Sequence, residues 1–295
     1  MLSLDRLRPE IAAGIEVIFT DIDGTLTDKA GRIPASVLFS MERLSATGIA
    51  VVPVTGRPAG WCDMIARTWP VDGVIGENGG LYFRRVHGPD GESMERVFAQ
   101  SAVVRSENRR KLDAFVDEVL SAHPGSALAS DQRYRELDVA IDFCEDVPRL
   151  PEEEVRSIMT DLAQRGCNVK LSNIHVNAWF GAHDKAAMCL RYATDRWGWS
   201  LQDDDAGRCL FFGDSPNDAP LFGLFPHSIG VANVAEMRDA IDPLPRYVTS
   251  GAGAAGFVEG VELLLSLRGA RFPTAKDELS LRHVDALLEL AVLSA

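Results

Sequence analysis

The strongest constraint on the fold is a regular change between two kinds of apolar pattern in the first quarter of the chain. Short runs rich in β-branched and aromatic residues predict buried strands, and the amphipathic stretches between them predict helices. This alternation is typical of a parallel sheet whose strands are joined by crossover helices. The predicted order is strand 15–19, helix 35–48, strand 50–54, helix 58–69 and strand 73–76.

After Gly80 the pattern changes, and it returns from His183 onward. The runs LYFRRV and ERVFAQ flank a turn-rich stretch and predict an antiparallel hairpin, which mixed helices and strands follow. We therefore predict an α/β fold: a Rossmann-like core with a parallel sheet, into which an α+β cap is inserted. The predicted bounds are 1–82 and 182–268 for the core, 83–181 for the cap and 269–295 for a helical C-terminal tail.

Composition excludes several classes of function. The formal net charge of -13 argues against general binding to nucleic acid or to an anionic membrane surface. The five cysteines are scattered and show no spacing typical of zinc sites, so we read them as reduced thiols. No apolar run approaches the roughly 20 residues that span a bilayer, and the first residues lack an apolar signal core. We expect a cytoplasmic protein whose tail packs on the core or on a second copy in a homodimer.

The first chemical motif is FTDIDGTLT at 19–27, directly after a predicted strand. Open parallel sheets place their ligands at the carboxyl ends of their strands. Asp21 and Asp23 are two residues apart at that point, so one carboxylate can attack as a nucleophile while the other transfers protons. An Asp-Gly pair after a strand is also an ordinary turn, and the motif alone leaves both readings open.

The second motif is VVPVTGRP at 51–58, again a strand that runs into a loop and a helix start. The Thr55 hydroxyl can hydrogen-bond a phosphoryl oxygen. Gly56 leaves room for a phosphate to approach backbone N–H groups near a helix start, where the helix dipole favours anions. A strand-to-helix turn with a solvated Arg57 is the plain alternative.

The third motif is FFGDSPNDAPLF at 211–222, where a predicted strand delivers Asp214 to the same sheet edge. Asn217 and Asp218 follow in the first helical turn, where they would also serve as helix caps. A further carboxylate beside Asp21 concentrates negative charge that requires a cation or protons. Mg²⁺ fits, because it prefers a few carboxylate oxygens and bridges to phosphate.

The fourth motif is a single lysine, Lys185, at the start of the helix that returns the chain to the core. A lone lysine is usually a solvated surface charge. At this position its ammonium would balance Asp21 and the oxygens of a transferring phosphoryl group.

Together and in this order, the four motifs resemble the haloacid dehalogenase superfamily of phosphohydrolases over residues 15–266. The cap follows the TGR motif, with ENGG at 77–80 just before it. This placement resembles subfamily IIB, which contains the Cof-type, sucrose-phosphate and mannosyl-3-phosphoglycerate phosphatases and acts mostly on phosphorylated sugars. The chain departs from the Cof pattern in having HDKAAM where SKG is common, which leaves the nearest subfamily open.

The resemblance implies a Mg²⁺-dependent phosphatase that hydrolyses a small phosphorylated metabolite through an aspartyl-phosphate. By resemblance Asp21 is the nucleophile, Asp23 the general acid and base, and Thr55 and Lys185 hold the phosphate. Gly56, Arg57 and Asn217 are expected to bind substrate as well. The implied metal ligands are Asp21, the backbone carbonyl of Asp23, Asp214 and Asp218.

The cap is expected to select the substrate, because the core motifs contact only its phosphate group. In SNIHVNAWF the polar residues Asn173, His175 and Asn177 alternate and therefore share one strand face, which looks either on the active site or on solvent. Arg135 in DQRYRELD, with its neighbours Arg133 and Tyr134, is the other candidate. Two alternatives to the phosphatase remain, namely a phosphosugar mutase of the same superfamily and a non-catalytic phosphometabolite-binding protein.

Overall fold

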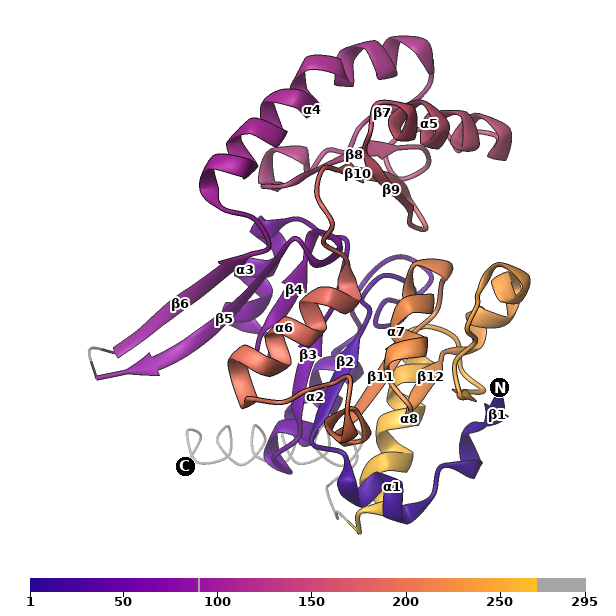
Figure 1. Ribbon diagram of the computed structural model, residues 1–295. Helices are drawn as coiled ribbons and strands as arrows, with labels where there is room; N and C mark the ends of the chain where they lie inside the picture. The colour runs from indigo at the N-terminus through magenta and orange to yellow at the C-terminus, as the bar shows by residue number, and fades with distance from the viewer. Residues whose placement is uncertain (90, 270–295) are drawn as a thin grey trace, which may run out of the picture.

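The computed structural model describes residues 1–89 and 91–269, and Figure 1 shows a larger body with a smaller one above it. The larger body contains the parallel sheet and both ends of the described chain. The smaller one contains helices α4 and α5 and the sheet beneath them. Apart from Gly269, the predicted C-terminal tail lies outside the described residues.

The centre of the core is a six-stranded sheet in which every neighbouring pair is parallel. The neighbouring strands β2 and β11 continue to opposite sides, because β2 is followed by β3 on one side and β11 by β12 on the other. The point between them is the switch of strand order, where open α/β sheets bind their ligands. In spatial order the strands are β1 (Leu2–Ser3), β13 (Tyr247–Val248), β12 (Ser228–Gly230), β11 (Cys209–Gly213), β2 (Val17–Thr20) and β3 (Ala50–Pro53).

Helices cover both faces of this sheet because its strands are apolar on both faces. Along β2, Ile18 belongs to the apolar cluster on one face and Phe19 to the cluster on the other. The first cluster includes α1 (Pro9–Gly14), α2 (Ala35–Ala46), α3 (Ala59–Thr68) and α8 (Ala254–Leu267), and the second includes α6 (Lys185–Trp197) and α7 (Ala219–Leu224). Short 3-10 turns complete the core: η1 (Leu4–Arg6), η4 (Asp204–Arg208), η5 (Pro216–Asp218) and η6 (Ala232–Ala240).

The strand predicted at 73–76 forms, as β4 (Val74–Gly76), but it is not part of the six-stranded sheet. It joins β3 only through a bridge between Val54 and Ile75, because the chain turns away into the TGR loop after Val54. Its other edge pairs with the predicted hairpin in a three-stranded antiparallel sheet. The hairpin strands are β5 (Leu81–Gly88) and β6 (Gly91–Phe98), and η2 (Glu77–Gly79) precedes them.

The cap is a four-stranded antiparallel sheet with two helices on its outer face, so that its other face looks toward the core (Figure 1). The helices and strands share an apolar cluster of their own, separate from the two clusters of the core. The elements are α4 (Ala102–Ala122), β7 (Ala127–Leu128), η3 (Gln132–Tyr134), β8 (Asp138–Asp142), α5 (Glu152–Gln164), β9 (Asn168–Leu171) and β10 (His175–Trp179).

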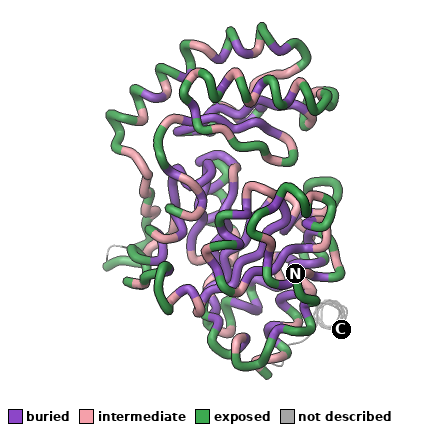
Figure 2. Tube along the Cα trace, turned by 45° about the vertical axis from the view of Figure 1, so that its right-hand side comes forward, coloured by how far each residue is buried: buried purple, intermediate pink, exposed green. Residues whose placement is uncertain are grey.

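Burial follows this division, with buried segments in the central sheet and in the cap sheet (Figure 2). The predicted fold class, a Rossmann-like α/β core with an inserted α+β cap, is confirmed. The domain bounds stay predictions, and the predicted cap start at residue 83 falls inside β5, which pairs with β4 beside the core. Within 1–89 and 91–269, no helix is long and apolar enough to cross a membrane.

Candidate active site

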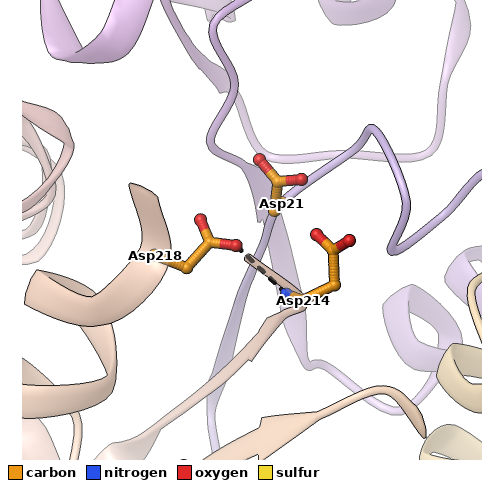
Figure 3. Close-up of side chains that lie close together, drawn as sticks. All are labelled: Asp21, Asp214 and Asp218. Carbon is orange, nitrogen blue, oxygen red and sulfur yellow. Dashed lines mark hydrogen bonds between the residues drawn. The ribbon is translucent and has the colours of Figure 1, made fainter. Parts of the chain in front are cut away.

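Two aspartates meet at the switch point of the central sheet. Asp21 follows β2 and Asp214 follows β11, and these strands are neighbours with Thr20 opposite Phe212. The backbone N–H of Asp21 extends the pairing by donating to the carbonyl of Phe212 at 2.8 Å. With Asp218 from the next turn they form a buried cluster whose ligand oxygens lie within 4.8 Å of one another (Figure 3).

Lys185 enters this cluster from the first position of α6. Its Nζ lies 2.6 Å from Oδ1 of Asp21 and 2.9 Å from Oδ1 of Asp218, and its side chain is only 5% exposed. The helix begins here because the preceding Asp184 accepts the N–H of Ala187 at 2.7 Å as an N-cap. This N-cap of α6 therefore fixes the position of Lys185 at the end of the sheet.

Asp218 holds the acidic loop together. Its Oδ2 accepts the backbone N–H groups of Asp214 at 3.1 Å and Ser215 at 3.3 Å, and Figure 3 draws the first of these. Its other oxygen faces Lys185. Asp218 thus bridges the loop and the lysine, and it belongs to the same group of possible metal ligands as Asp21 and Asp214.

Asp214 is held by two groups besides the loop. The Thr25 hydroxyl donates to Oδ1 at 3.3 Å, and the Asn233 amide donates to Oδ2 at 2.7 Å. Asn233 was not among the predicted residues, although it closely follows β12 and so belongs to the same sheet edge. Gly24, with φ of +87°, leaves room for this side chain, because a Cβ there would lie 2.2 Å from Oδ2 of Asp214.

The cluster carries more negative than positive charge. Burial raises the pKa of Asp21 well above its usual range; Lys185 opposes this shift, while Asp218 and Asp214 add to it. Burial raises the pKa of Asp214 to about 7, with Asp218 acting in the same direction. For Lys185, burial alone would lower the pKa, but Asp21 and Asp218 outweigh it and raise the pKa.

Three buried carboxylates beside one ammonium therefore fit a divalent cation. Carboxylate oxygens are the ligands that Mg²⁺ prefers, and the carboxylates of Asp21 and Asp214 lie close together at the sheet edge (Figure 3). The donor set of this structure accordingly fits the predicted Mg²⁺.

Asp23 lies apart from this cluster and is bound by Arg57. The guanidinium donates from Nε to Oδ2 at 3.0 Å and from Nη2 to Oδ1 at 2.9 Å, which is a two-point ion pair. Thr55 is buried, and its hydroxyl oxygen accepts the backbone N–H of Arg57 at 3.0 Å. The carbonyl of Gly56 accepts a hydrogen bond from Arg135 at 3.0 Å.

The cap residues predicted on one strand face do lie over this edge of the core. Asn173, His175 and Asn177 line one cavity with Asp21, Asp23 and the TGR loop. Its volume of about 20 Å³ is room for about one water. The other residues around the cavity are Gly56, Arg57, Arg135, Ser172, Ile174, Ser215 and Asn217.

Several of these side chains are already engaged by the protein. Arg135 is buried, with ion pairs to Asp131 at 3.2 Å and to Asp138 at 3.1 Å. The Asn177 amide donates to Oδ2 of Asp138 at 3.1 Å, and Asn217 accepts the Ser215 hydroxyl at 2.5 Å. Of the neighbours considered with Arg135, Tyr134 is 54% exposed and does not line the cavity.

Glu77 and Glu145 were missed by sequence reasoning although they join the two bodies. Glu77, in ENGG, accepts the backbone N–H of Ala59 in the core and those of residues 136–138 at the start of β8. Glu145, after β8, binds both Arg57 of the core and His175 of the cap. Glu77 stood beside a recognised motif, whereas nothing in the sequence around Glu145 distinguishes it from a surface acid.

Comparisons with known proteins agree with this geometry. The family model described as haloacid dehalogenase-like hydrolase matches residues 18–97. A phosphoglycolate phosphatase of Pyrobaculum neutrophilum is 29% identical over 255 residues, which cover 86% of this chain and 97% of that protein.

Solved structures share the fold. A haloacid dehalogenase-like hydrolase from Bacteroides thetaiotaomicron has a TM-score of 0.60 at 17% identity, and the match covers 85% of this chain and 99% of that one. A subclass IIB sugar phosphatase has a TM-score of 0.56 at 17% identity, with the same coverage of both chains. The family match over residues 18–97 and the relatives named phosphoglycolate phosphatase make this chain similar to phosphatases of the haloacid dehalogenase-like hydrolases, and the solved structures share its fold.

Proposed function

We propose that this protein is a Mg²⁺-dependent phosphatase that hydrolyses a small phosphorylated metabolite through an aspartyl-phosphate on Asp21. One observation carries the proposal: a buried lysine bridges Asp21 and Asp218 beside Asp214, at the switch point of a parallel sheet. Phosphoryl transfer needs a nucleophile, fixed positive charge and a metal site within a few ångströms. This cluster supplies the first two and fits the third.

In the proposed reaction a carboxylate oxygen of Asp21 attacks phosphorus, and the bond from phosphorus to the leaving oxygen breaks. Asp23 donates a proton to that oxygen, which leaves as an alcohol. A water molecule then attacks the phosphorus of the aspartyl-phosphate and gives a proton to Asp23, so that inorganic phosphate and free Asp21 result. Lys185 offsets the charge that develops on the phosphoryl oxygens.

Asp21, Asp214 and the backbone carbonyl of Asp23 would hold Mg²⁺, with Asp218 orienting the loop and the lysine. A bound Mg²⁺ supplies positive charge that neutralises the phosphoryl oxygens and orients them. Thr55, Gly56 and Asn217 are proposed to contact the phosphoryl group from the neighbouring loops. The cytoplasm stays the predicted location.

Asp23 has to leave its ion pair with Arg57 before it can act as an acid or base. A carboxylate held at two points by a guanidinium is not free to face a leaving oxygen. The cavity has room for about one water, so a substrate must also move the cap. The observed arrangement therefore supports a closed, substrate-free state, from which the cap opens for entry.

The substrate is proposed only as a class. Relatives named phosphoglycolate phosphatase make phosphoglycolate one candidate, and the IIB type of cap keeps phosphorylated sugars as the other. The test is release of inorganic phosphate from a panel that contains both, with Mg²⁺ and again with EDTA. Release that EDTA abolishes and Mg²⁺ restores supports the proposal, and release that EDTA leaves unchanged would refute the role of the metal.

Two other activities remain to be separated from hydrolysis. A phosphosugar mutase would transfer the phosphoryl group to a sugar acceptor, and a non-catalytic binding protein would transfer no phosphoryl group. Single-turnover assays with water alone and with added sugar acceptors distinguish the three. The proposal predicts that the yield of inorganic phosphate does not depend on the acceptor.

A further inference from the structure

The cap holds one acid, Glu145, beside the residues of the active-site cavity, on a loop that hydrogen bonds fix in place. Asp142, buried at the end of β8, accepts the backbone N–H groups of Cys144 at 2.8 Å, Glu145 at 2.7 Å and Asp146 at 2.8 Å. Three hydrogen bonds to one carboxylate fix the loop backbone. The side chain of Glu145 is therefore directed by the fold and is not a free surface acid.

Glu145 binds one group from each body. Its Oε1 lies 3.3 Å from Nη1 of Arg57, and its Oε2 lies 2.8 Å from Nε2 of His175. Arg57 and His175 line the cavity, and Glu145 contacts both without being a lining residue itself. Arg57 on this side of the cavity therefore already has a carboxylate partner, and another oxygen of the same carboxylate lies beside the imidazole of His175.

The side of the cavity formed by Arg57 and the cap residues, called the leaving-group side below, carries an excess of negative charge. Arg57 faces three carboxylates, with Asp23 at 2.9 Å, Glu145 at 3.3 Å and Asp131 at 3.8 Å. The neighbouring Arg135 shares Asp131 and pairs with Asp138. With His175 counted as neutral, four carboxylates thus surround two guanidiniums, and three remain when Asp23 carries the proton of the proposed mechanism.

A second carboxylate, brought in by the substrate, would be repelled by this excess. Uncharged hydroxyl groups would not. The amides of Asn173 and Asn177 line the same cavity. Each donates one hydrogen bond within the protein, to the carbonyl of Asp23 and to Asp138, and an amide has further donor and acceptor capacity for a substrate hydroxyl.

We infer that the cap selects phosphate esters with an uncharged, hydroxyl-bearing leaving group over esters of hydroxy acids, and that Glu145 determines this specificity. The inference rests on the proposed phosphatase function and narrows its substrate. It separates this chain from the activity in the names of the relatives, because phosphoglycolate carries a carboxylate beside its phosphate ester.

The test compares substrates that differ only in this group. Phosphoglycolate and 2-hydroxyethyl phosphate form a small pair, and 6-phosphogluconate and glucitol 6-phosphate a larger one. We expect kcat/KM to favour the neutral member of each pair by about tenfold. Two unit charges about 10 Å apart, at an effective dielectric constant of about 20, repel with about that effect. For a compound that is not turned over, its inhibition constant against p-nitrophenyl phosphate replaces kcat/KM.

The variant Glu145→Gln removes the charge and keeps the shape of the side chain. It is expected to shift the ratio of the two kcat/KM values toward the acid by about tenfold. Glu152→Gln is the matched control, because Glu152 lies in the same cap with its side chain 91% exposed, and it is expected to leave the ratio unchanged. If Glu145→Gln does not fold, the preference of the unaltered enzyme still decides the inference.

The outcomes separate this inference from the proposed function. A preference of the unaltered enzyme for the acids, or an unchanged ratio in folded Glu145→Gln, overturns the inference and leaves the phosphatase intact. Failure to release phosphate from any phosphate ester, p-nitrophenyl phosphate included, overturns the proposed function instead. A neutral preference that Glu145→Gln reduces and Glu152→Gln retains supports the inference.

Discussion

The two sides of the active-site cavity are built in different ways. The phosphate side comes from parallel strand ends, which place Asp21 and Asp214 on neighbouring strands and Lys185 at a capped helix start. The leaving-group side comes from the cap, where His175 lies on an antiparallel strand and Glu145 on a loop. Glu145 contacts His175 and also Arg57 of the core. The first side is fixed within one sheet, and the second depends on how two bodies meet.

This difference assigns the two sides different tasks. Groups on a single buried sheet edge hold their geometry whether or not the cap moves, which suits a reaction that needs charge placed in advance. Groups that span the boundary change partners when the cap opens, which suits selection of the substrate. Substitutions on the phosphate side should therefore reduce kcat for every substrate, and those on the cap side should change preference among substrates.

The largest effect is expected for Asp21→Asn. An amide is a poor nucleophile, so turnover should fall by about 10⁴-fold or more with every substrate. Phosphate release measures the loss, and circular dichroism checks that the fold is kept. Asp239→Asn, on an exposed turn, is the control and should keep full activity. Substantial turnover by folded Asp21→Asn would remove Asp21 from the role of nucleophile.

Lys185→Met should have the next largest effect. The variant removes the ammonium between Asp21 and Asp218, and loss of such fixed charge typically reduces kcat by about 10²- to 10³-fold. Kinetics at saturating Mg²⁺ with several substrates test this, with Lys29→Met in an exposed loop as the control. A loss confined to one substrate would contradict the division between the two sides, because a phosphate-side group should not discriminate among leaving groups.

The stability of the fold is expected to depend on pH through His183, which lies in the segment that links the cap to the core. This histidine lies between β10 and α6, where the chain passes from the cap back to the core, and it stacks on Trp179. Neither of its ring nitrogens has a hydrogen-bond partner in the described chain. Burial lowers its pKa to about 4, against the opposing effect of Asp138 and Asp184. Between about pH 6.5 and pH 4 the unfolded chain therefore binds more protons than the folded one, so stability falls as pH falls.

The expected loss from His183 is about 2 to 3 kcal/mol between pH 7 and pH 4.5. Urea unfolding at both pH values measures it. His183→Gln should lose less stability over this range, and His87→Gln, with a side chain 75% exposed on the hairpin, should behave like the unaltered protein. Equal losses in all three proteins would mean that His183 does not carry this dependence.

Most of the phosphate side could be predicted from sequence because its residues stand directly after recognisable strands. Asp21, Thr55 and Asp214 each end an apolar run, and parallel strands bring such ends to one edge without any knowledge of distant contacts. Asn233 obeys the same rule after β12 and was missed only because no motif marks it.

The cap side was less predictable because its contacts depend on partners far apart in the sequence. Period-two alternation placed His175 and Asn177 on one face, but the side to which that face turns is set by α4 and α5, which cover the other. Arg135 was predicted to bind substrate, and the structure also shows its guanidinium shared by Asp131, Asp138 and Gly56. No local pattern could have shown that Glu145 meets Arg57, 88 positions away in the sequence.

The smallest effect, and the sharpest test of the comparison, is expected for His175→Ala. The imidazole lines the cavity but does not contact Asp21, Lys185 or Asp214, so its loss should raise KM for substrates with large polar leaving groups by about tenfold. With p-nitrophenyl phosphate, which offers the cap no hydroxyl groups, kcat should stay within about twofold. His87→Ala controls for the loss of a histidine far from the cavity. If kcat instead collapsed with both kinds of substrate, the cap would be supplying a group to the chemical step, and the division of tasks between the two sides of the cavity would fail.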